Sequence, residues 1–550
     1  MKSSVIVNQG ATLTIQPGVE VRFDESKAIQ VDGTLIARGT AQAKILFTNS
    51  TVNKKWGYIL FTDSSVGAEF DKEQYVDGSI LEYCIVEYAG GMDREGAVIC
   101  EKASPFISYC EIRNNATQGI RTKGASGLMV SNCIIEKNTG QGINTTDSSS
   151  LTIASCTINN NSKGGVSSSS GSLTITSSQI SNNTASGSGG GVSSSSGSLT
   201  ITSSQISNNT ASGSGGGVSS SSGSLTITSS VISSNKASNT SGNAHGGGIW
   251  AYGTYGKVWV SYSLIMDNSA DHAAAMFCSG SSLKLIGNTF VCNKHSKGTA
   301  ILVNGFSSYA INHNNFCNSN IKYELYRNDP STSSTLDATQ NYWCSEDESE
   351  IMERIFDFFD DSSRGRVEYY PFLTEPDPNA PLPTFYRDSD QDNYGDPTQS
   401  IQALEAPAGY VDNFGDCNDQ DGQINPEATE ICNGIDDDCD GLNDENLTQL
   451  CPDGQTIATC QNGQWVGCTT PPPPPTPTIP CGDADGNGTV DISDALLIAE
   501  YDVGLKDSSQ LSGFKACDIN KDGVVDLCDA LMIAEYDVGL VSKLECRWID

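Results

Sequence analysis

Residues 164–189 read GGVSSSSGSLTITSSQISNNTASGSG, and the chain repeats this stretch almost unchanged twice more, as far as about residue 235. Apolar residues recur at one spacing in all three copies: Val166, Val192 and Val218; Leu173, Leu199 and Leu225; Ile180, Ile206 and Ile232. Each copy carries too few apolar residues to bury a core alone, so the copies must stack on one another. Their alternation with Ser, Thr and Asn predicts short strands and no helix.

Three short strands per copy, each with one or two inward side chains, describe one turn of a solenoid. This pattern resembles the right-handed parallel β-helix repeat family. The same frame continues upstream, for example in QGINTTDSSSLTIASCTINNN, and downstream, for example in GGGIWAYGTYGKVWVSYSLIMDN. The resemblance therefore implies a mainly β protein in which residues 1–345 form a right-handed parallel β-helix.

Two columns of polar side chains are predicted within this solenoid. An asparagine follows the third strand of successive turns, where stacked amides can bond the turns above and below: Asn115, Asn138, Asn160, Asn183, Asn209, Asn235 and Asn268. A cysteine precedes that strand in four turns: Cys84, Cys110, Cys133 and Cys156. Turns stack at about 4.8 Å, slightly too far for relaxed disulfides, so the sequence predicts a column of buried thiols, with strained bridging as the alternative.

The segment after the repeats is predicted to close the solenoid. NYWCSEDESEIMERIFDFFDDSSRGRVEYYPFL resembles the NYWG…PFL ending of many β-helix proteins, with Cys344 in place of the glycine. Within this closing segment, 346–373, four apolar residues at helical spacing predict an amphipathic helix over the open end of the core: Ile351, Ile355, Phe358 and Phe359. A short linker, 374–384, then separates the β-helix from an acidic Cys-rich module, 385–468. A stiffer proline-rich linker, 469–480, separates that module from a C-terminal module, 481–550.

Composition limits the partners and the compartment. The formal charge of −35 argues against nucleic acid, because an acidic surface repels phosphate. Nine of the 19 cysteines lie in the β-helix and ten between Cys417 and Cys546, in short polar segments that need disulfides to fold. This predicts an extracellular or cell-surface protein. No apolar run approaches a membrane span, and the N-terminus enters a strand without an apolar signal core.

The C-terminal module carries two oxygen-rich loops, DADGNGTVDISD and DINKDGVVDLCD, each running into a nearly identical helix. Acidic or amide side chains stand at positions 1, 3, 5, 9 and 12, with glycine at 6, which is the spacing of a calcium loop. The first loop offers Asp483, Asp485, Asn487, Thr489, Asp491 and Asp494; the second offers Asp518, Asn520, Asp522, Val524, Asp526 and Asp529. Thr489 and Val524, at position 7, would contribute backbone carbonyls.

Aspartate at position 12, and no helix before the loop, resemble type I dockerins, which bind cohesin domains. The resemblance implies two calcium ions and a partner-binding face at Ile492, Ser493, Leu527 and Cys528 and on the helix that follows each loop. The alternative is that the calcium loops serve local stability alone. Cys528 is unusual at such a face and is expected to pair with another cysteine, and a Cys481–Cys546 bridge would clasp the module's ends.

The acidic module offers two further carboxylate runs. Asp388, Asp390, Asp392 and Asp396 are spaced like a thrombospondin type 3 calcium loop; Asp436, Asp438, Asp440 and Asp444 form the second run, interleaved with Cys417, Cys432 and Cys439. The module resembles the MopE-type metal-binding repeat. Carboxylates without histidine favour calcium over a transition metal, and a disordered acidic spacer is the alternative.

The β-helix offers weaker chemistry. Three of the four histidines precede successive turns, and aromatic residues lie on the neighbouring turn. The candidate glycan-binding residues are His245, Trp250, Tyr252, Trp259, His272 and His295, since aromatic faces stack on sugar rings; a solvated ladder of turn residues is the alternative. Two functions remain open: a carbohydrate-binding or structural module attached to a cohesin-bearing scaffold, or a polysaccharide lyase or glycoside hydrolase of a cellulosome-like complex. The Ser-rich repeats and the lack of a carboxylate pair favour the first.

Overall fold

The computed structural model describes residues 1–72, 74–125, 127–295, 298–305, 308–330, 335–451, 456–468, 480–511, 514–520 and 524–544. The chain forms two compact units. The first comprises residues 1–387 and 398–414, and the second comprises residues 388–397 and 415–550.

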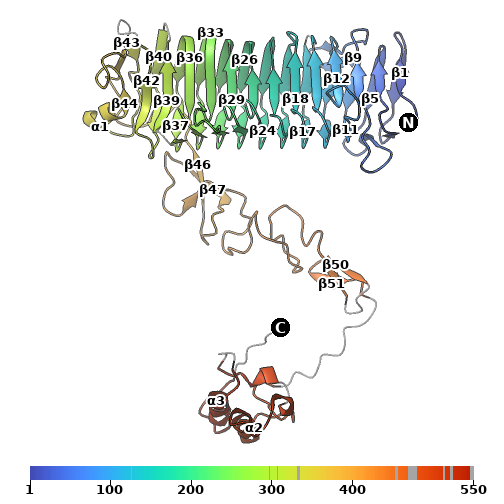
Figure 1. Cartoon of the computed structure of the whole chain (residues 1–550), viewed down its shortest axis with the longest axis vertical. Coiled ribbons are helices and arrows are strands. Elements are labelled where there is room, and N and C mark those ends of the chain that lie inside the picture. The colour runs from blue at the N-terminus through green and yellow to red at the C-terminus, as the bar shows by residue number, and fades with distance from the viewer. Residues whose placement is uncertain are drawn as a thin grey trace. The chain divides into compact units, whose positions relative to one another are not determined.

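The first unit is a right-handed parallel β-solenoid, in which each turn lays its strands in register on those of the previous turn (Figure 1). Because one copy of the repeat pairs with the next, Val166 lies beside Val192 and Val192 beside Val218. The strands stack in columns. The first column contains β1 (Val5–Val7), β4 (Ile29–Val31), β7 (Ile59–Phe61), β12 (Val98–Glu101), β15 (Ile120–Lys123), β18 (Ile143–Thr146), β21 (Val166–Ser168), β25 (Val192–Ser194), β29 (Val218–Ser221), β33 (Ile249–Ser261), β36 (Met276–Ile286), β39 (Thr299–Asn304), β42 (Tyr323–Arg327) and β44 (Ile355–Phe356).

The second column joins the first at β33 and β36, which run through both. Its other strands are β2 (Thr12–Ile15), β5 (Thr34–Arg38), β10 (Ile80–Glu82), β13 (Phe106–Ser108), β16 (Leu128–Ser131), β19 (Leu151–Ala154), β22 (Ser172–Thr176), β26 (Gly197–Thr202), β30 (Gly223–Thr228) and β40 (Ser308–Asn312). The third column contains β3 (Glu20–Phe23), β6 (Ile45–Asn49), β11 (Cys84–Glu87), β14 (Glu111–Arg113), β17 (Ile134–Glu136), β20 (Thr157–Asn159), β23 (Gln179–Ser181), β27 (Gln205–Ser207), β31 (Val231–Ser233), β34 (Leu264–Met266), β37 (Thr289–Val291) and β41 (Asn315–Cys317).

Three smaller groups of strands complete the first unit. A short fourth column contains β24 (Thr184–Ala185), β28 (Thr210–Ala211), β32 (Lys236–Ala237), β35 (Ser269–Ala270) and β38 (Lys294–His295). An antiparallel hairpin, β8 (Glu69–Asp71) and β9 (Gln74–Asp77), projects from an early turn, and a parallel pair, β43 (Thr335–Asp337) and β45 (Arg366–Glu368), lies near the end.

The inward side chains form one continuous apolar core, and polar ladders run beside it. In the asparagine ladder each amide oxygen accepts from the backbone and side-chain nitrogens of the asparagine one turn before, as Asn209 does from Asn183 at 3.0 Å. Asn161, and not the predicted Asn160, holds the ladder position after Asn138. Asn160 has a left-handed backbone, at φ 53°, which turns its side chain away from the core.

The four predicted thiols are confirmed as a buried column without disulfides. Cys133 donates its backbone amide to the sulfur of Cys156, and Cys156 donates its own to Ser178. The same position continues as serine and then asparagine: Ser204, Ser230, Ser263, Asn288, Asn314 and Asn341. Burial raises the pKa of the Cys100 thiol above its usual range, as it does for the thiols of the column at Cys110 and Cys133.

The closing segment differs from the predicted helix. Helix α1 covers only Glu348–Glu353, capped by Asp347. It buries Ile351, but Ile355 joins strand β44 and pairs with Leu325. Sheet pairing therefore ends the helix after two turns, and Phe359 is 70% exposed instead of packing on the core. A disulfide between Cys317 and Cys344, not predicted, joins the last turn of the third column to the closing segment.

Short elements make up the remainder of the described chain. A three-stranded sheet contains β46 (Thr384–Arg387), β47 (Asp396–Gln402) and β48 (Tyr410–Val411), and an antiparallel sheet contains β49 (Thr448–Leu450), β50 (Ile457–Gln461) and β51 (Gln464–Val466). Helices α2 (Ile492–Asp502) and α3 (Leu527–Asp537) and the 3-10 turns η1 (Ser508–Gln510) and η2 (Phe514–Cys517) follow. No helix among the described residues has the length and apolarity to cross a membrane.

Candidate functional site

Helices α2 and α3 repeat each other in structure as well as in sequence. Asp491 caps α2 by accepting from the Ser493 amide, and Asp526 caps α3 by accepting from the Cys528 amide. Both helices begin with a capping box, closed by Asp494 in one and by Asp529 in the other. The paired helices and loops share a small core that contains Ile498 and Ile533.

The position-12 aspartates tie each predicted calcium loop together. Asp494 accepts from the amides of Ala484 and Asp485 at 2.8 and 3.0 Å, and Asp529 does the same for Ile519 and Asn520 at 2.7 and 3.0 Å. The last residue of each loop therefore lies against its beginning. Burial raises the pKa of the Asp529 carboxyl above its usual range.

The first loop fits a cation. Asp483 is 1% exposed and accepts from the amides of Gly486, Asn487 and Gly488, and Asp494 is fully buried. Within the described residues both carboxylates meet backbone amides and no basic side chain. Buried carboxylates of this kind fit a hard cation, because neutral donors offset only part of their desolvation.

Asp485, Asn487 and Thr489 of the first loop lie at the surface. Asn487 accepts from the Thr489 amide, Asp485 accepts from the Asn487 amide, and Val524 is exposed. In the second loop Asp518 is buried beside Asn520, whereas Asp522 lies outside the described residues.

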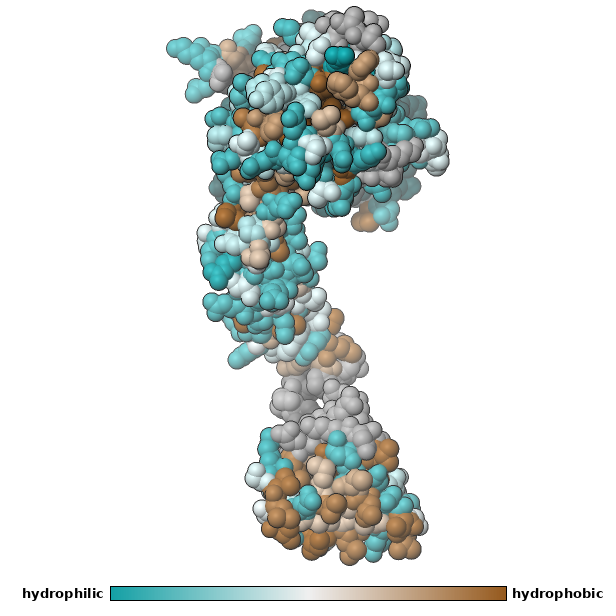
Figure 2. Space-filling model, turned by 90° about the vertical axis from the view of Figure 1, so that its left-hand side faces the viewer, coloured by the Kyte–Doolittle hydropathy of each residue, from teal (hydrophilic) through white to brown (hydrophobic). Residues whose placement is uncertain are grey.

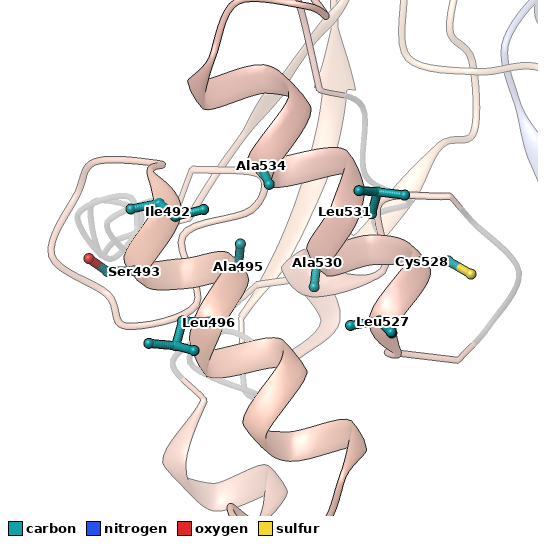
Figure 3. Close-up of a pocket in the computed structure, with 9 residues that line it drawn as sticks. All are labelled: Ile492, Ser493, Ala495, Leu496, Leu527, Cys528, Ala530, Leu531 and Ala534. Atoms are coloured by element: carbon teal, nitrogen blue, oxygen red, sulfur yellow. The ribbon is translucent and has the colours of Figure 1, made fainter.

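The predicted partner-binding residues lie together on one apolar groove between the two helices (Figure 3). The groove has a volume of about 680 Å³. It is lined from α2 by Ile492, Ser493, Ala495 and Leu496 and from α3 by Leu527, Cys528, Ala530, Leu531 and Ala534. Leu496 and Leu531 are 60% and 59% exposed, and apolar side chains gather on this part of the molecule in Figure 2.

The sequence placed the helix face after each loop at the partner-binding surface, but it did not single out the two leucines and the alanines of the groove. The signal was present, since Leu496 follows Ile492 by four residues and Leu531 follows Leu527 by four, one helical turn. Cys528 keeps an exposed thiol, so its expected disulfide is wrong. Cys481 is disulfide-bonded, and its predicted partner Cys546 lies outside the described residues.

The carboxylates of the acidic module form clusters that contain part of each predicted run and add residues from outside the runs. Oxygens of Asp388, Asp390 and Asp392 lie within 4.8 Å of one another, and Asp390 belongs to a second set with Asp416 and Asp419. Asp396 begins strand β47.

In the second run, Asp438 clusters with Asp436 and Glu430, and also with Asp440 and Glu445. Burial, and then the charge of Asp440, raises the pKa of Asp438. Asp444 instead accepts from the amides of Asn433, Gly434 and Gly463, and the Gly434 bond is the main cause of its lowered pKa. Glu430 and Glu445 fall outside the alternating Asp pattern, which is why the sequence did not point to them.

The module's cysteines are paired, as expected. Disulfides join Cys417 to Cys439, Cys432 to Cys460 and Cys451 to Cys468. These sulfurs are therefore not thiolate ligands, which leaves carboxylates as the metal-binding chemistry of the module.

The candidate glycan-binding residues separate into two groups. The rings of His245 and His272 stack with their centroids 4.8 Å apart, and the His245 ring lies 4.9 Å from that of Phe277. The rings of Tyr252 and Trp250 stack with their centroids 5.5 Å apart. Trp259 lies instead under the ammonium groups of Lys284 and Lys257, at 4.5 and 5.9 Å.

His295 is out of register with the other two histidines. Its backbone pairs with Ala270, whereas the backbones of His245 and His272 pair with each other. Phe277, which the sequence reasoning missed, joins the first aromatic group because β36 pairs in register with β33 beneath Trp250.

Three family models match the chain. The right-handed β-helix region matches residues 35–206, the MopE-type metal-binding motif residues 416–445, and the dockerin type I domain residues 481–536. The chain thus contains a right-handed β-helix region, a MopE-type metal-binding motif and a C-terminal type I dockerin domain. The clusters of this motif are made of carboxylates, apart from the set in which Asp444 lies beside the Cys432–Cys460 disulfide.

No curated protein matches this sequence. Among solved structures, the crystal structure of the Agl-KA catalytic domain is similar, at 14% identity and a TM-score of 0.22 over 66% of this chain. The chain spans 61% of that domain. A likeness at this level carries no argument about activity.

Proposed function

We propose that the protein is an extracellular, calcium-binding component of a cohesin-based assembly. Its dockerin attaches it to the assembly, and its β-helix is the module that is displayed there. The observation that carries this proposal is the apolar groove, in which exposed Leu496 and Leu531 lie beside two carboxylate loops. An exposed apolar surface bounded by polar residues is typical of a protein-binding site. The partner is a cohesin-bearing scaffold or surface protein.

Calcium would hold the groove in shape. The first ion would bind Asp483, Asp485, Asn487, the Thr489 carbonyl, Asp491 and Asp494, and the second would bind the equivalent residues from Asp518 to Asp529. Each ion would neutralise its loop's carboxylates, and Asp494 and Asp529 close the helix caps from which the groove residues project. We also assign calcium to the acidic module.

The attachment is tested by charging the groove. Leu496→Asp combined with Leu531→Asp should reduce the affinity for a cohesin at least about 100-fold, because two exposed apolar anchors are replaced by charge. The matched control is Leu505→Asp with Leu540→Asp, two equally exposed leucines that follow the helices and lie outside the groove. Calorimetry on full-length variants measures both, and an unchanged affinity in the groove variant would reject this surface.

The aromatic surface of the β-helix supports a second role, carbohydrate binding. Stacked Trp250 and Tyr252, together with Trp259, which is 37% exposed, offer the flat apolar surfaces on which sugar rings pack. In gels that contain a binding polysaccharide, the Trp250→Ala, Trp259→Ala variant should be retarded less than the native protein. The control is Trp465→Ala, an exposed tryptophan of strand β51. Equal retardation of native and variant protein would place the carbohydrate site elsewhere.

Catalysis by the β-helix is the competing proposal. A polysaccharide lyase would release unsaturated products from an acidic polysaccharide, and a glycoside hydrolase would release reducing ends. Incubating the full chain with calcium and a panel of acidic polysaccharides separates these reactions from simple binding.

A further inference from the structure

Two segments that are distant in sequence meet at one cluster of carboxylates in the second compact unit. Asp390 of the upstream segment has an oxygen within 4.8 Å of oxygens of both Asp416 and Asp419, which belong to the MopE-type motif. The chain between these segments, residues 398–414, belongs to the first unit. The cluster therefore joins the two ends of an excursion of the chain.

Direct contacts hold the two segments against each other. Ser389 donates its amide and its hydroxyl to the two oxygens of Asp419, at 2.7 and 2.6 Å. Gly422 packs so closely that a β-carbon there would lie 3.2 Å from Cβ of Asp392. The carboxylates are thus brought together by packing of the backbone.

Three oxygens of this cluster and of the set that Asp390 shares with Asp388 and Asp392 are buried and lack a hydrogen-bond partner among the described residues. They are the Oδ2 atoms of Asp390, Asp392 and Asp416. Asp416 is only 3% exposed, and its other oxygen accepts from the Asn418 amide. Carboxylate oxygens that are buried, mutually repelling and without donors need a compensating positive charge.

We propose that Asp390, Asp392, Asp416 and Asp419 bind one calcium-class cation that is shared between the two segments. Oxygen-only ligands select a hard divalent cation, and Cys417, beside Asp416, is held in a disulfide and offers no thiolate. The inference rests on the proposed calcium binding of the acidic module. It adds that residues 416–445 do not form a complete site without the segment at 388–392.

The shared ion is tested by counting calcium per chain in equilibrium dialysis at a fixed free calcium that saturates the native protein. Asp390→Asn and Asp416→Asn should each lose one equivalent, and the double variant should lose the same one equivalent. The matched control, Asp421→Asn, changes an aspartate of the same segment that accepts from the Gln423 amide outside both sets, and should keep every ion. Two equivalents lost in the double variant, or none in Asp416→Asn, would overturn the proposal.

Hydrogen exchange on the unmodified chain gives a test that does not depend on variants. Residues 388–392 and 416–422 should gain protection together, at one calcium midpoint, whereas separate midpoints would contradict a shared ion. Cohesin affinity of Asp416→Asn should equal that of the native protein. The two proposals can therefore fail independently: loss of the shared ion leaves cohesin attachment intact, and loss of cohesin binding leaves the calcium count unchanged.

Discussion

Asn209 in the β-helix and Asp494 in the dockerin are both fully buried polar side chains, but they are satisfied differently. Asn209 donates to the carbonyls of Ile180 and Ser207 and to Asn235, and its oxygen accepts two bonds from Asn183. Every donor and acceptor of this amide finds a partner in the chain. The partners that the described residues offer the Asp494 carboxylate are backbone amides.

The two regions therefore depend on different conditions. The β-helix contains its own stabilising interactions, since amide ladders and stacked Val, Leu and Ile need nothing from the solvent. The C-terminal unit combines small cores and disulfides with buried carboxylates whose charge needs a cation. This unit should respond to calcium and to reduction of its disulfides, whereas the β-helix should not respond to calcium.

Chelation of calcium should produce the largest difference between the two regions. Removing calcium should unfold α2 and α3, because the carboxylates of Asp494 and Asp529 then repel their loop partners without compensation. The strand signal of the β-helix should persist. Circular dichroism with added chelator, followed by calcium rescue, measures both at once. Loss of the strand signal together with the helices would show that the two regions are not independent.

Interrupting the amide ladder is the reciprocal change. Asn209→Ala should destabilise the β-helix by about 3 kcal/mol, since it leaves buried groups of the neighbouring turns without partners. The same substitution at Asn159, whose side chain faces outward and bonds only Asn160, should cost less than about 0.5 kcal/mol. Urea unfolding followed by circular dichroism measures the loss of stability in both variants. Equal losses would show that the asparagine ladder does not stabilise the β-helix.

A pH-dependent effect of no larger size concerns a buried carboxylate within the β-helix itself. Glu324 ends the asparagine ladder by accepting hydrogen bonds from the backbone and side-chain nitrogens of Asn318. Burial raises the pKa of Glu324 to about 7. Because the folded state then holds the proton more tightly than the unfolded state, ionisation costs stability. Stability should fall by up to about 3 kcal/mol as pH rises from about 4.5 to 7, and then level off.

Comparison with Glu324→Gln isolates this effect. The variant has no titrating group at this position, so the difference in unfolding free energy between the two proteins should change across that pH window. A difference that stays constant with pH would mean that Glu324 ionises freely when folded.

Predictability from sequence depended on how local each signal was. The 26-residue repeat predicted strand register correctly, because parallel stacking places identical residues side by side. The asparagine ladder was predicted one residue out at Asn160, because three consecutive asparagines offer no means to tell which one follows a left-handed turn. A shift of one residue reverses the direction of a side chain.

The prediction of a longer closing helix was wrong for a related reason. Helical spacing of Ile351 and Ile355 is also compatible with a helix that ends between them, and the free edge of β42 decided that Ile355 would pair as a strand. Competition between a local helical pattern and a distant strand edge is not visible along the sequence.

The sequence by itself determined the solenoid, the two calcium-loop patterns and the repeated helices, because each is written in residues close together in the chain. Only the tertiary structure decided that Leu496 and Leu531 complete one groove, that Phe277 joins Trp250 and Tyr252, and that Asp416 lies beside Asp390. The physical reason is that these neighbours depend on which faces become buried and which distant segments pack together. Local spacing does not encode that choice.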